Sequence, residues 1–387
     1  MPSRETCWKK GFSLTTIYDI AKRAGVSSAT VSKVLNGYPD VNRETRARVE
    51  AITQELGYKQ NAVARGLATK RSMTIGVFFR DHANSGLRHP FFADVLASFK
   101  DVIGVAGYDL LFFANNAPDN VHSGYEDRAR HRNVDGLLLL GVWRTDPGLE
   151  AISRSSIPCL SVDLDLLGPR ASYLVSDNVD GAKKAVDYLV QCGHTRIAFV
   201  GDRFSTKPGH DRLVGYQQGL EHNGLLFRHE WVLDGDFTEE GGRFAMERML
   251  ELPDLPTAIF FAGDMMAIGG MELLKQRGYV IPEDFSIIGF DDIVMSSHLS
   301  PALTTIRQKR GEMGTRAAQE LLELIHKPGK PPSGVVVDVE LVARETVRIV
   351  CADSSSSLAS SDFFEKSGQA CDVDAVEQVC VTHSAEE

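Results

Sequence analysis

The chain has 387 residues, of which 43% are hydrophobic and 24% are charged. This balance is typical of a globular protein of about two to four folded units, and it excludes a wholly disordered or fibrous chain. No run reaches the ~18 apolar residues of a membrane span, and residues 1–12 lack the apolar core of a signal peptide, so we expect neither. The six cysteines form no CxxC pair and no zinc spacing, which favours free thiols, no structural metal and a reduced cytoplasmic compartment.

The charge is divided unevenly along the chain. The formal net charge is −10, yet residues 1–72 carry 13 Lys and Arg against 6 Asp and Glu. This pattern is expected when a small basic module binds a polyanion and the acidic body to which it is attached repels that polyanion. Chance clustering of charges on a solvated surface is the alternative, and the charge pattern alone does not decide between the two.

The basic module has the pattern of three short helices. The first covers residues 17–24, where apolar side chains recur at i, i+3, i+4 and i+7 and a glycine follows. A second helix follows a cap at Ser27 or Ser28, and a third runs from about 42 to 57. The spacing of the first two helices predicts a helix-turn-helix.

The polar face of the second predicted helix consists of short side chains. Such a face can approach base edges in the major groove, where Lys33 reaches guanine acceptors and Ala29 a thymine methyl group. The alternative is a solvated face of an ordinary three-helix bundle. Residues 61–69 form helices by composition but have too few apolar groups to be stable alone, and Leu67 is suited to wedge between base steps in the minor groove.

This module resembles the headpiece of the lactose-repressor (LacI/GalR) family of transcription regulators. The resemblance is carried by the run Thr-Thr-Ile-Tyr-Asp-Ile-Ala-Lys-Arg-Ala-Gly-Val-Ser-Ser-Ala-Thr-Val-Ser-Lys-Val-Leu-Asn at 15–36 and by the hinge pattern at 61–67. It implies that seven residues lie at or near DNA: Thr16, Ser27, Ser28, Ala29, Thr30, Lys33 and Asn36. It also implies that Asn61, Ala64 and Leu67 enter the minor groove at the operator centre.

Beyond residue 73, apolar strand-like runs alternate with amphipathic stretches. The predicted strands are 74–79, 108–113, 136–142 and 158–162, then 172–175, 196–201, 257–262 and 285–289. The predicted helices are 91–105, 181–192, 213–223, 239–250, 265–276 and 312–325. Continuous apolar strands separated by helices indicate parallel sheets covered on both faces. Two such series predict an α/β body of two doubly wound subdomains with a cleft between them.

Ligands in such folds bind beyond the carboxyl ends of the strands. Six side chains at or just after those ends are candidates to bind a ligand: Phe91, Asp177, Arg212, Phe237, Asp264 and Asp291. The charged members can hold hydroxyl or amide groups, and the two aromatic rings can stack on a sugar or a base. For any one of them, helix capping or ordinary packing is the alternative.

The resemblance to the lactose-repressor family continues over residues 73–350. It implies a body shaped like a periplasmic sugar-binding protein, with three crossings between subdomains and with effector contacts at Arg212, Phe237 and Asp291. Gly263 and His89 depart from the family pattern, because asparagine is frequent at both positions.

These observations predict five segments. They are a flexible arm (1–13), a helix-turn-helix headpiece (14–60), a hinge helix and linker (61–72), the effector-binding and dimerisation body (73–350) and a disordered acidic tail (351–387). An oligomerisation helix is the alternative for the tail. A sugar carrier would leave residues 15–72 unexplained. An enzyme would be expected to show a glycine fingerprint after the first strand or a GxSxG, HExxH or P-loop motif, and the sequence has none.

We therefore expect a transcription regulator, more specifically a repressor, that needs no cofactor and has no catalytic residue. Its expected partners are a pseudo-palindromic operator and a small effector, by family a sugar or sugar derivative, with a purine as the alternative. We expect a homodimer or a tetramer at the nucleoid in the bacterial cytoplasm.

Overall fold

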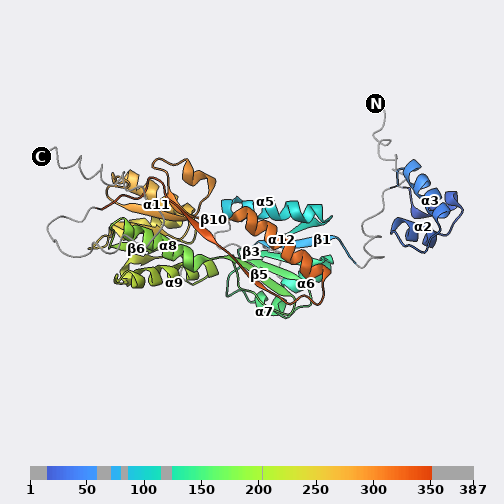
Figure 1. Ribbon diagram of the computed structural model, residues 1–387, viewed down its shortest axis with the longest axis horizontal. Coiled ribbons are helices and arrows are strands. Elements are labelled where there is room, and N and C mark those ends of the chain that lie inside the picture. The colour runs from blue at the N-terminus through green and yellow to red at the C-terminus, as the bar shows by residue number, and fades with distance from the viewer. Residues whose placement is uncertain (1–14, 59–70, 80–85, 115–123, 203, 351–387) are drawn as a thin grey trace, which may run out of the picture.

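The computed structural model describes residues 15–58, 71–79, 86–114, 124–202 and 204–350. They form a three-helix headpiece followed by a body with two six-stranded sheets (Figure 1). The predicted arm (1–13), the predicted tail (351–387) and three predicted minor-groove residues, Asn61, Ala64 and Leu67, lie outside the described residues.

The headpiece consists of α1 (Ile17–Ala24), α2 (Ser28–Leu35) and α3 (Arg43–Glu55). Gly25, the glycine that follows the first predicted helix, ends α1 in a left-handed conformation with a φ of 66°. Ser27, rather than Ser28, caps α2 by accepting a hydrogen bond from the backbone N of Thr30 at 3.1 Å. Because helices this short are marginal alone, the headpiece depends on its own small core, in which Ile20, Val31 and Val49 are fully buried.

The first part of the body, the N-subdomain, is a parallel sheet with helices on both faces. Its strand order is β11-β5-β4-β3-β1-β2. The strands are β1 (Thr74–Phe79), β2 (Asp109–Phe113), β3 (Gly136–Leu140), β4 (Cys159–Val162), β5 (Ala171–Ser176) and β11 (Gly334–Val337). Helices α5 (Pro90–Val105) and α12 (Arg310–His326) cover one face, while α6 (Tyr125–Arg132) and α7 (Gly148–Ser153) cover the other. Both faces are therefore buried, which explains the unbroken apolar runs in its central strands.

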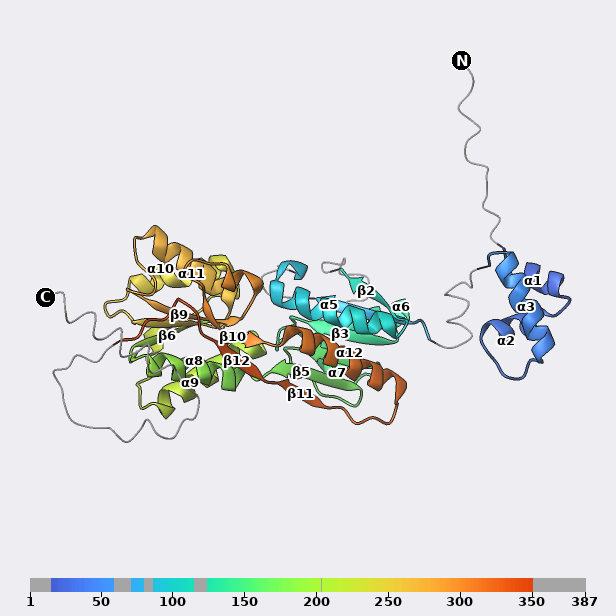
Figure 2. The ribbon, with the colours of Figure 1, turned by 45° about the horizontal axis from the view of Figure 1, so that its top comes forward.

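The second part, the C-subdomain, has the strand order β12-β10-β9-β8-β6-β7. The strands are β6 (Ile197–Val200), β7 (Val232–Leu233), β8 (Ala258–Phe261), β9 (Ser286–Asp291), β10 (Thr304–Gln308) and β12 (Val339–Val342), and only the pair β10–β12 is antiparallel. Helices α8 (Asn178–Gln191) and α9 (Lys207–His222) lie on one side of this sheet. Helices α10 (Glu239–Leu250) and α11 (Asp264–Gln276) lie on the other side (Figure 2).

The chain passes between the two subdomains three times, as the family resemblance implies. The passages connect β5 to α8, β10 to α12 and β11 to β12. Each subdomain is consequently built from segments that are far apart in the sequence. Helix α12 and strand β11 complete the N-subdomain although they follow the whole of the central C-subdomain segment (Figure 2).

The packing of α10 on α11 requires a glycine at position 242. A Cβ atom at Gly242 would lie 2.0 Å from the backbone oxygen of Met266 on the neighbouring helix. No side chain fits at that separation, so the two helices meet backbone to backbone at this point.

The structure also corrects several predicted elements. Helices α6 and α7 and strands β7, β10, β11 and β12 were not predicted. Helices α8, α9 and α12 begin earlier than predicted, at Asn178, Lys207 and Arg310. Within the described residues, no helix has both the length and the apolar character needed to span a bilayer.

Candidate functional site

A pocket lies between the two subdomains, at the carboxyl ends of strands from both sheets. It has a volume of about 610 Å³, part of it open to solvent. Its N-subdomain wall consists of His89, Phe91, Phe92, Gly141, Val142 and Asp163. Its C-subdomain wall consists of Thr206, Pro208, Arg212, Asp236, Phe237, Asp291 and Gln308. The position is the one expected for a ligand site in a doubly wound fold.

Arg212 is the central charge of this pocket and is only 2% exposed. Its Nε donates to Asn178 Oδ1 at 2.8 Å, and its guanidinium lies 3.6 Å from Asp291 Oδ1 and 3.7 Å from the centre of the Phe290 ring. Burial lowers the pKa of Arg212, while the nearby carboxylates act in the opposite direction. These contacts fix the orientation of the guanidinium before any ligand is bound.

Two buried acceptors in the pocket have no hydrogen-bond partner among the described residues. They are Oδ1 of Asp163 and Oε1 of Gln308, on side chains that are 7% and 3% exposed. The amide nitrogen of Gln308 is already used, because it donates to Asp291 Oδ1 at 2.6 Å. Burial raises the pKa of Asp163 to about 7, with Arg212 opposing and Asp291 reinforcing that shift. An unsatisfied buried acceptor is costly, so both atoms are suited to accept from a ligand.

The backbone of the pocket is strained at four of its lining residues. Asp163, Asp236, Phe237 and Asp291 have φ angles of 61°, 45°, 62° and 119°. Each such residue costs on the order of 1–3 kcal/mol, and strain of this kind clusters at ligand clamps and switch regions. Both walls of the pocket therefore contain backbone of the strained kind that is common at ligand sites.

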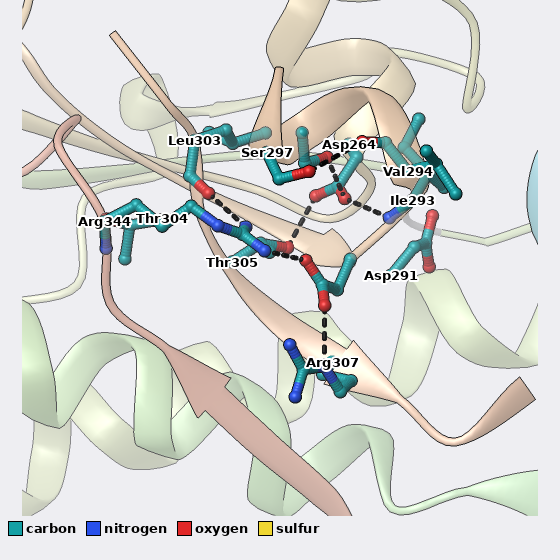
Figure 3. Close-up of polar contacts among 12 residues, drawn as sticks. Asp264, Asp291, Ile293, Val294, Ser297, Leu303, Thr304, Thr305, Arg307 and Arg344 are labelled. Atoms are coloured by element: carbon teal, nitrogen blue, oxygen red, sulfur yellow. Dashed lines mark hydrogen bonds and ion pairs between the residues drawn. The ribbon is translucent and has the colours of Figure 1, made fainter. Parts of the chain in front are cut away.

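Asp264 lies behind the pocket rather than in it. It is fully buried and accepts from the backbone N of Ile293 at 3.0 Å, from Ser296 Oγ at 2.6 Å and from Thr305 Oγ1 at 2.6 Å (Figure 3). Burial and the nearby Asp291 carboxylate raise its pKa, and these three hydrogen bonds oppose the shift. Asp264 thus ties the loop that follows β9 to the adjacent strand β10.

A second network connects the pocket loop to the N-subdomain. Arg310, the first residue of α12, donates from one guanidinium nitrogen to the backbone oxygens of Asp291 and Asp292, each at 2.6 Å. Its Nε lies 2.9 Å from Asp94 Oδ2 on α5. We call this set of contacts, from Asp94 through Arg310 to the carbonyls of Asp291 and Asp292, the Arg310 bridge. The Arg310 bridge thus connects Asp291, a strained residue of the pocket, to helices α5 and α12 of the N-subdomain.

The headpiece presents one face of α2 to solvent. Thr16, Ser27, Ala29 and Lys33 are exposed, and Ser28, Thr30 and Asn36 are half-buried. Lys33 forms an ion pair with Asp40, and both side chains are about half exposed. The hydroxyl groups of Thr16 and Ser27 are used in helix capping.

Comparison with known proteins identifies this combination of a headpiece and a two-subdomain body. The family model described as bacterial regulatory proteins, lacI family, matches residues 16–61, and that of a periplasmic binding protein-like domain matches residues 186–347. The HTH-type transcriptional repressor PurR of Haemophilus influenzae (strain PittEE) is 35% identical over 87% of this chain and 100% of that protein. The chain belongs to the LacI family.

Other LacI-family members agree with this assignment. Catabolite control protein A of Priestia megaterium is 33% identical over 81% of this chain and 93% of that protein. The Lac repressor dimer bound to operator and the anti-inducer ONPF has a TM-score of 0.71 at 29% identity, over 86% of this chain and 99% of that chain. The regulator CelR in its cellobiose complex has a TM-score of 0.64 at 28% identity, with the same coverage. The chain is a DNA-binding transcriptional repressor, as its relatives are.

The structure brings together four of the six residues that were predicted to bind an effector. Phe91, Arg212, Phe237 and Asp291 line the pocket of this LacI-family protein.

It places the other two elsewhere. Asp177 caps α8 by accepting from the backbone N of Asp180 at 3.1 Å, and Asp264 binds the loop beneath the pocket. Both residues follow the capping alternative, or a related structural role, rather than that of a ligand contact.

Sequence reasoning missed several pocket residues. Asp163 comes directly after the predicted strand 158–162, so the rule for strand ends could have found it. Asp236 adjoins the predicted Phe237, whereas Gln308 ends a strand that was not predicted. Within the described residues, no group of three or more His, Cys, Asp or Glu side chains could hold a metal ion.

Proposed function

We propose that this repressor is a homodimer whose affinity for a pseudo-palindromic operator is controlled by a sugar-like molecule in the pocket. The observation that carries the proposal is the buried pair of Arg212 and Asp291, held at 3.6 Å beside Phe237 at the junction of the subdomains. A fixed guanidinium and carboxylate suit vicinal hydroxyl groups, and an aromatic ring suits the apolar face of a sugar. The structures titled with cellobiose for CelR and with ribose for an Enterococcus faecium regulator support this class of ligand.

The headpiece has the features required for the DNA-binding part of the proposal. The exposed face of α2 carries Ala29 and Lys33. Ala29 is short enough to approach base edges in the major groove, and Lys33 is a cation that can contact a base edge or a phosphate. Lys33 would exchange its exposed ion pair with Asp40 for a phosphate or a guanine, at small cost, because pairs of this kind contribute little. Thr16, Ser27, Ser28, Thr30 and Asn36 surround this face, and Asn61, Ala64 and Leu67 remain proposed minor-groove contacts.

The proposed mechanism is a shift between two arrangements of the subdomains. A ligand in the pocket touches both walls, so it favours the arrangement in which both walls reach it. The N-subdomain begins at β1, directly after the hinge segment, so its movement changes how the two headpieces are spaced. The coupling is reciprocal, because operator binding must change effector affinity by the same factor. We place the protein at operator DNA in the bacterial cytoplasm.

The DNA-binding part is tested with the purified full-length protein. In vitro selection from random duplexes should yield a site with two related half-sites, and fluorescence anisotropy then measures affinity for that site and for a scrambled duplex. We expect Lys33→Ala to weaken binding to the selected site by about tenfold, the loss of one good base or phosphate contact. Lys100→Ala removes a similarly exposed cation from the body and should leave affinity unchanged. Equal losses in the two variants would contradict the role of α2.

The effector part is tested by adding candidate sugars to the protein–operator complex. A ligand that binds in the pocket should change operator affinity, and Arg212→Ala should abolish that response while operator binding persists. A response that survives in Arg212→Ala would place the effector elsewhere.

A further inference from the structure

We propose that the pocket selects an uncharged effector with at least two hydroxyl donors, and that Asp163 is the residue that excludes anionic sugars such as uronates and sugar phosphates. This inference rests on the proposed sugar-like effector and deepens it. Two features of the pocket carry it, the unused acceptors and the balance of charge, and a third feature, the backbone at Asp163, allows a conservative test.

The first feature is the direction of the unused hydrogen bonds. Asp163 Oδ1 and Gln308 Oε1 are buried acceptors with no partner in the part of the chain that the structure describes, and they come from opposite subdomains. A ligand that bridges the pocket must therefore bring a donor to each wall. Hydroxyl groups donate, whereas ionised carboxylates and the charged oxygens of phosphates only accept. When Asp163 is ionised, at a pH above its pKa of about 7, an anionic group beside it would leave its oxygen unsatisfied and add repulsion.

The second feature is the balance of charge. Among the described residues, the lining contains three carboxyl groups, Asp163, Asp236 and Asp291, and one guanidinium, that of Arg212. Arg212 is already paired with Asp291 at 3.6 Å and interacts electrostatically with Asp163, so it has no uncompensated charge for an anion. Burying a further negative charge among these carboxyl groups is costly. A neutral molecule avoids the desolvation cost of burying a charged group of either sign, so it fits best.

The third feature makes the idea testable with a conservative change. Asp163 has a φ of 61°, in the left-handed region that asparagine adopts about as readily as aspartate. Asp163→Asn therefore keeps the size and backbone of the residue, removes its charge and adds an amide donor. Asp165→Asn is the matched control, because Asp165 lies two residues further along and is not part of the pocket lining.

The experiment uses sets of probes that share one skeleton. Glucose, galactose, ribose and cellobiose are each compared with an acidic counterpart, a uronic or aldonic acid or the phosphate, and glucosamine supplies a cationic probe. Isothermal titration of the full-length protein in mildly alkaline buffer, where Asp163 is ionised, gives affinities, and anisotropy of the operator complex shows whether a bound probe acts as an effector. Hypoxanthine and guanine are included as effectors of another class.

We expect a neutral sugar to bind at least about tenfold more tightly than its acidic counterpart, a difference of one decade in Kd. In Asp163→Asn that preference should shrink by about tenfold or reverse, while Asp165→Asn should keep it. An acidic sugar that binds more tightly to the wild-type protein and shifts operator affinity would overturn the inference and leave the proposed function standing. If Asp163→Asn keeps the full preference for the neutral sugar, the inference is likewise overturned and the proposed function stands. A response to the purines alone, or to no probe at millimolar concentration, would overturn the sugar-like effector and this inference with it.

Discussion

The Arg310 bridge predicts that one arginine on α12 stabilises the body far more than its neighbours do. In Arg310→Ala, the backbone oxygens of Asp291 and Asp292 lose donors that now lie at 2.6 Å, and Asp94 loses its partner at 2.9 Å. A hydrogen bond to a charged group contributes about 1.5–3 kcal/mol. The pair with Asp94 is half exposed, so we discount it to about 0.5 kcal/mol. The expected loss is about 2–4 kcal/mol, because the two carbonyl contacts share one nitrogen.

For a unit of this size, such a loss lowers Tm by about 4–16 °C, since each kcal/mol shifts Tm by about 2–4 °C. Scanning calorimetry of the full-length protein measures it. Arg316→Ala is the control on the same helix, because Arg316 pairs with Glu312 at 3.1 Å with both side chains 43% exposed, and we expect a fall of at most about 2 °C. Arg310→Lys should be intermediate, since an ammonium keeps the charge but lacks the planar fork. A Tm for Arg310→Ala that matches the Arg316→Ala value would refute the reasoning.

Three further predictions concern single positions. Ser27→Ala removes the cap of α2 and should destabilise the headpiece by about 1 kcal/mol, which hydrogen exchange of the α2 amides would show as about a fivefold loss of protection; unchanged protection would argue against the cap. Gly242→Ala should lower Tm by several degrees because its Cβ would lie 2.0 Å from a backbone oxygen of α11. In contrast, nothing lies within 4 Å of a Cβ at position 104, so Gly104→Ala should raise Tm slightly by reducing the conformational entropy of the unfolded chain. Burial raises the pKa of Asp163 to about 7, so its contribution to stability is complete below its unfolded pKa of about 4 and is lost as the pH rises through 7. Asp163→Asn should therefore lessen the decrease in Tm between mildly acidic and mildly alkaline buffer, and an identical decrease in both proteins would count against the shift.

The predicted strands of the central sheets agree with the structure because a strand that is buried on both faces appears in the sequence as a continuous apolar run. The strand at 74–79 is recovered to the residue, and alternate residues of it pack against helices on opposite faces. Strand β10 gives no such signal, since Thr304 and Thr305 are buried and polar. Their hydroxyl groups are satisfied by contacts to other segments, such as that from Thr305 to Asp264. Helix α6 is missed for a related reason, because only Tyr125 and Ala129 on it are buried.

From the sequence, pocket residues could be predicted only by the rule that ligands bind at the carboxyl ends of strands. That rule finds Arg212 and Asp291, yet it cannot separate Asp291 from Asp264, because both are acids at strand ends. The separation depends on the loop after β9, whose Ser296 turns back to bind Asp264. The Arg310 bridge is beyond local sequence patterns altogether, because it joins residues more than 200 positions apart.

The threefold passage of the chain between subdomains has a consequence for biosynthesis. The N-subdomain is translated first, yet its edge strand β11 ends at Val337 and its covering helix α12 begins at Arg310. During translation, the sheet of β1 to β5 has one face covered by α5 alone until the intervening C-subdomain segment and α12 have been made, and the apolar surface left exposed favours aggregation. Neither subdomain can therefore complete its fold before the other. A chain that ends before residue 310 lacks α12 and β11 of the N-subdomain and β12 of the C-subdomain.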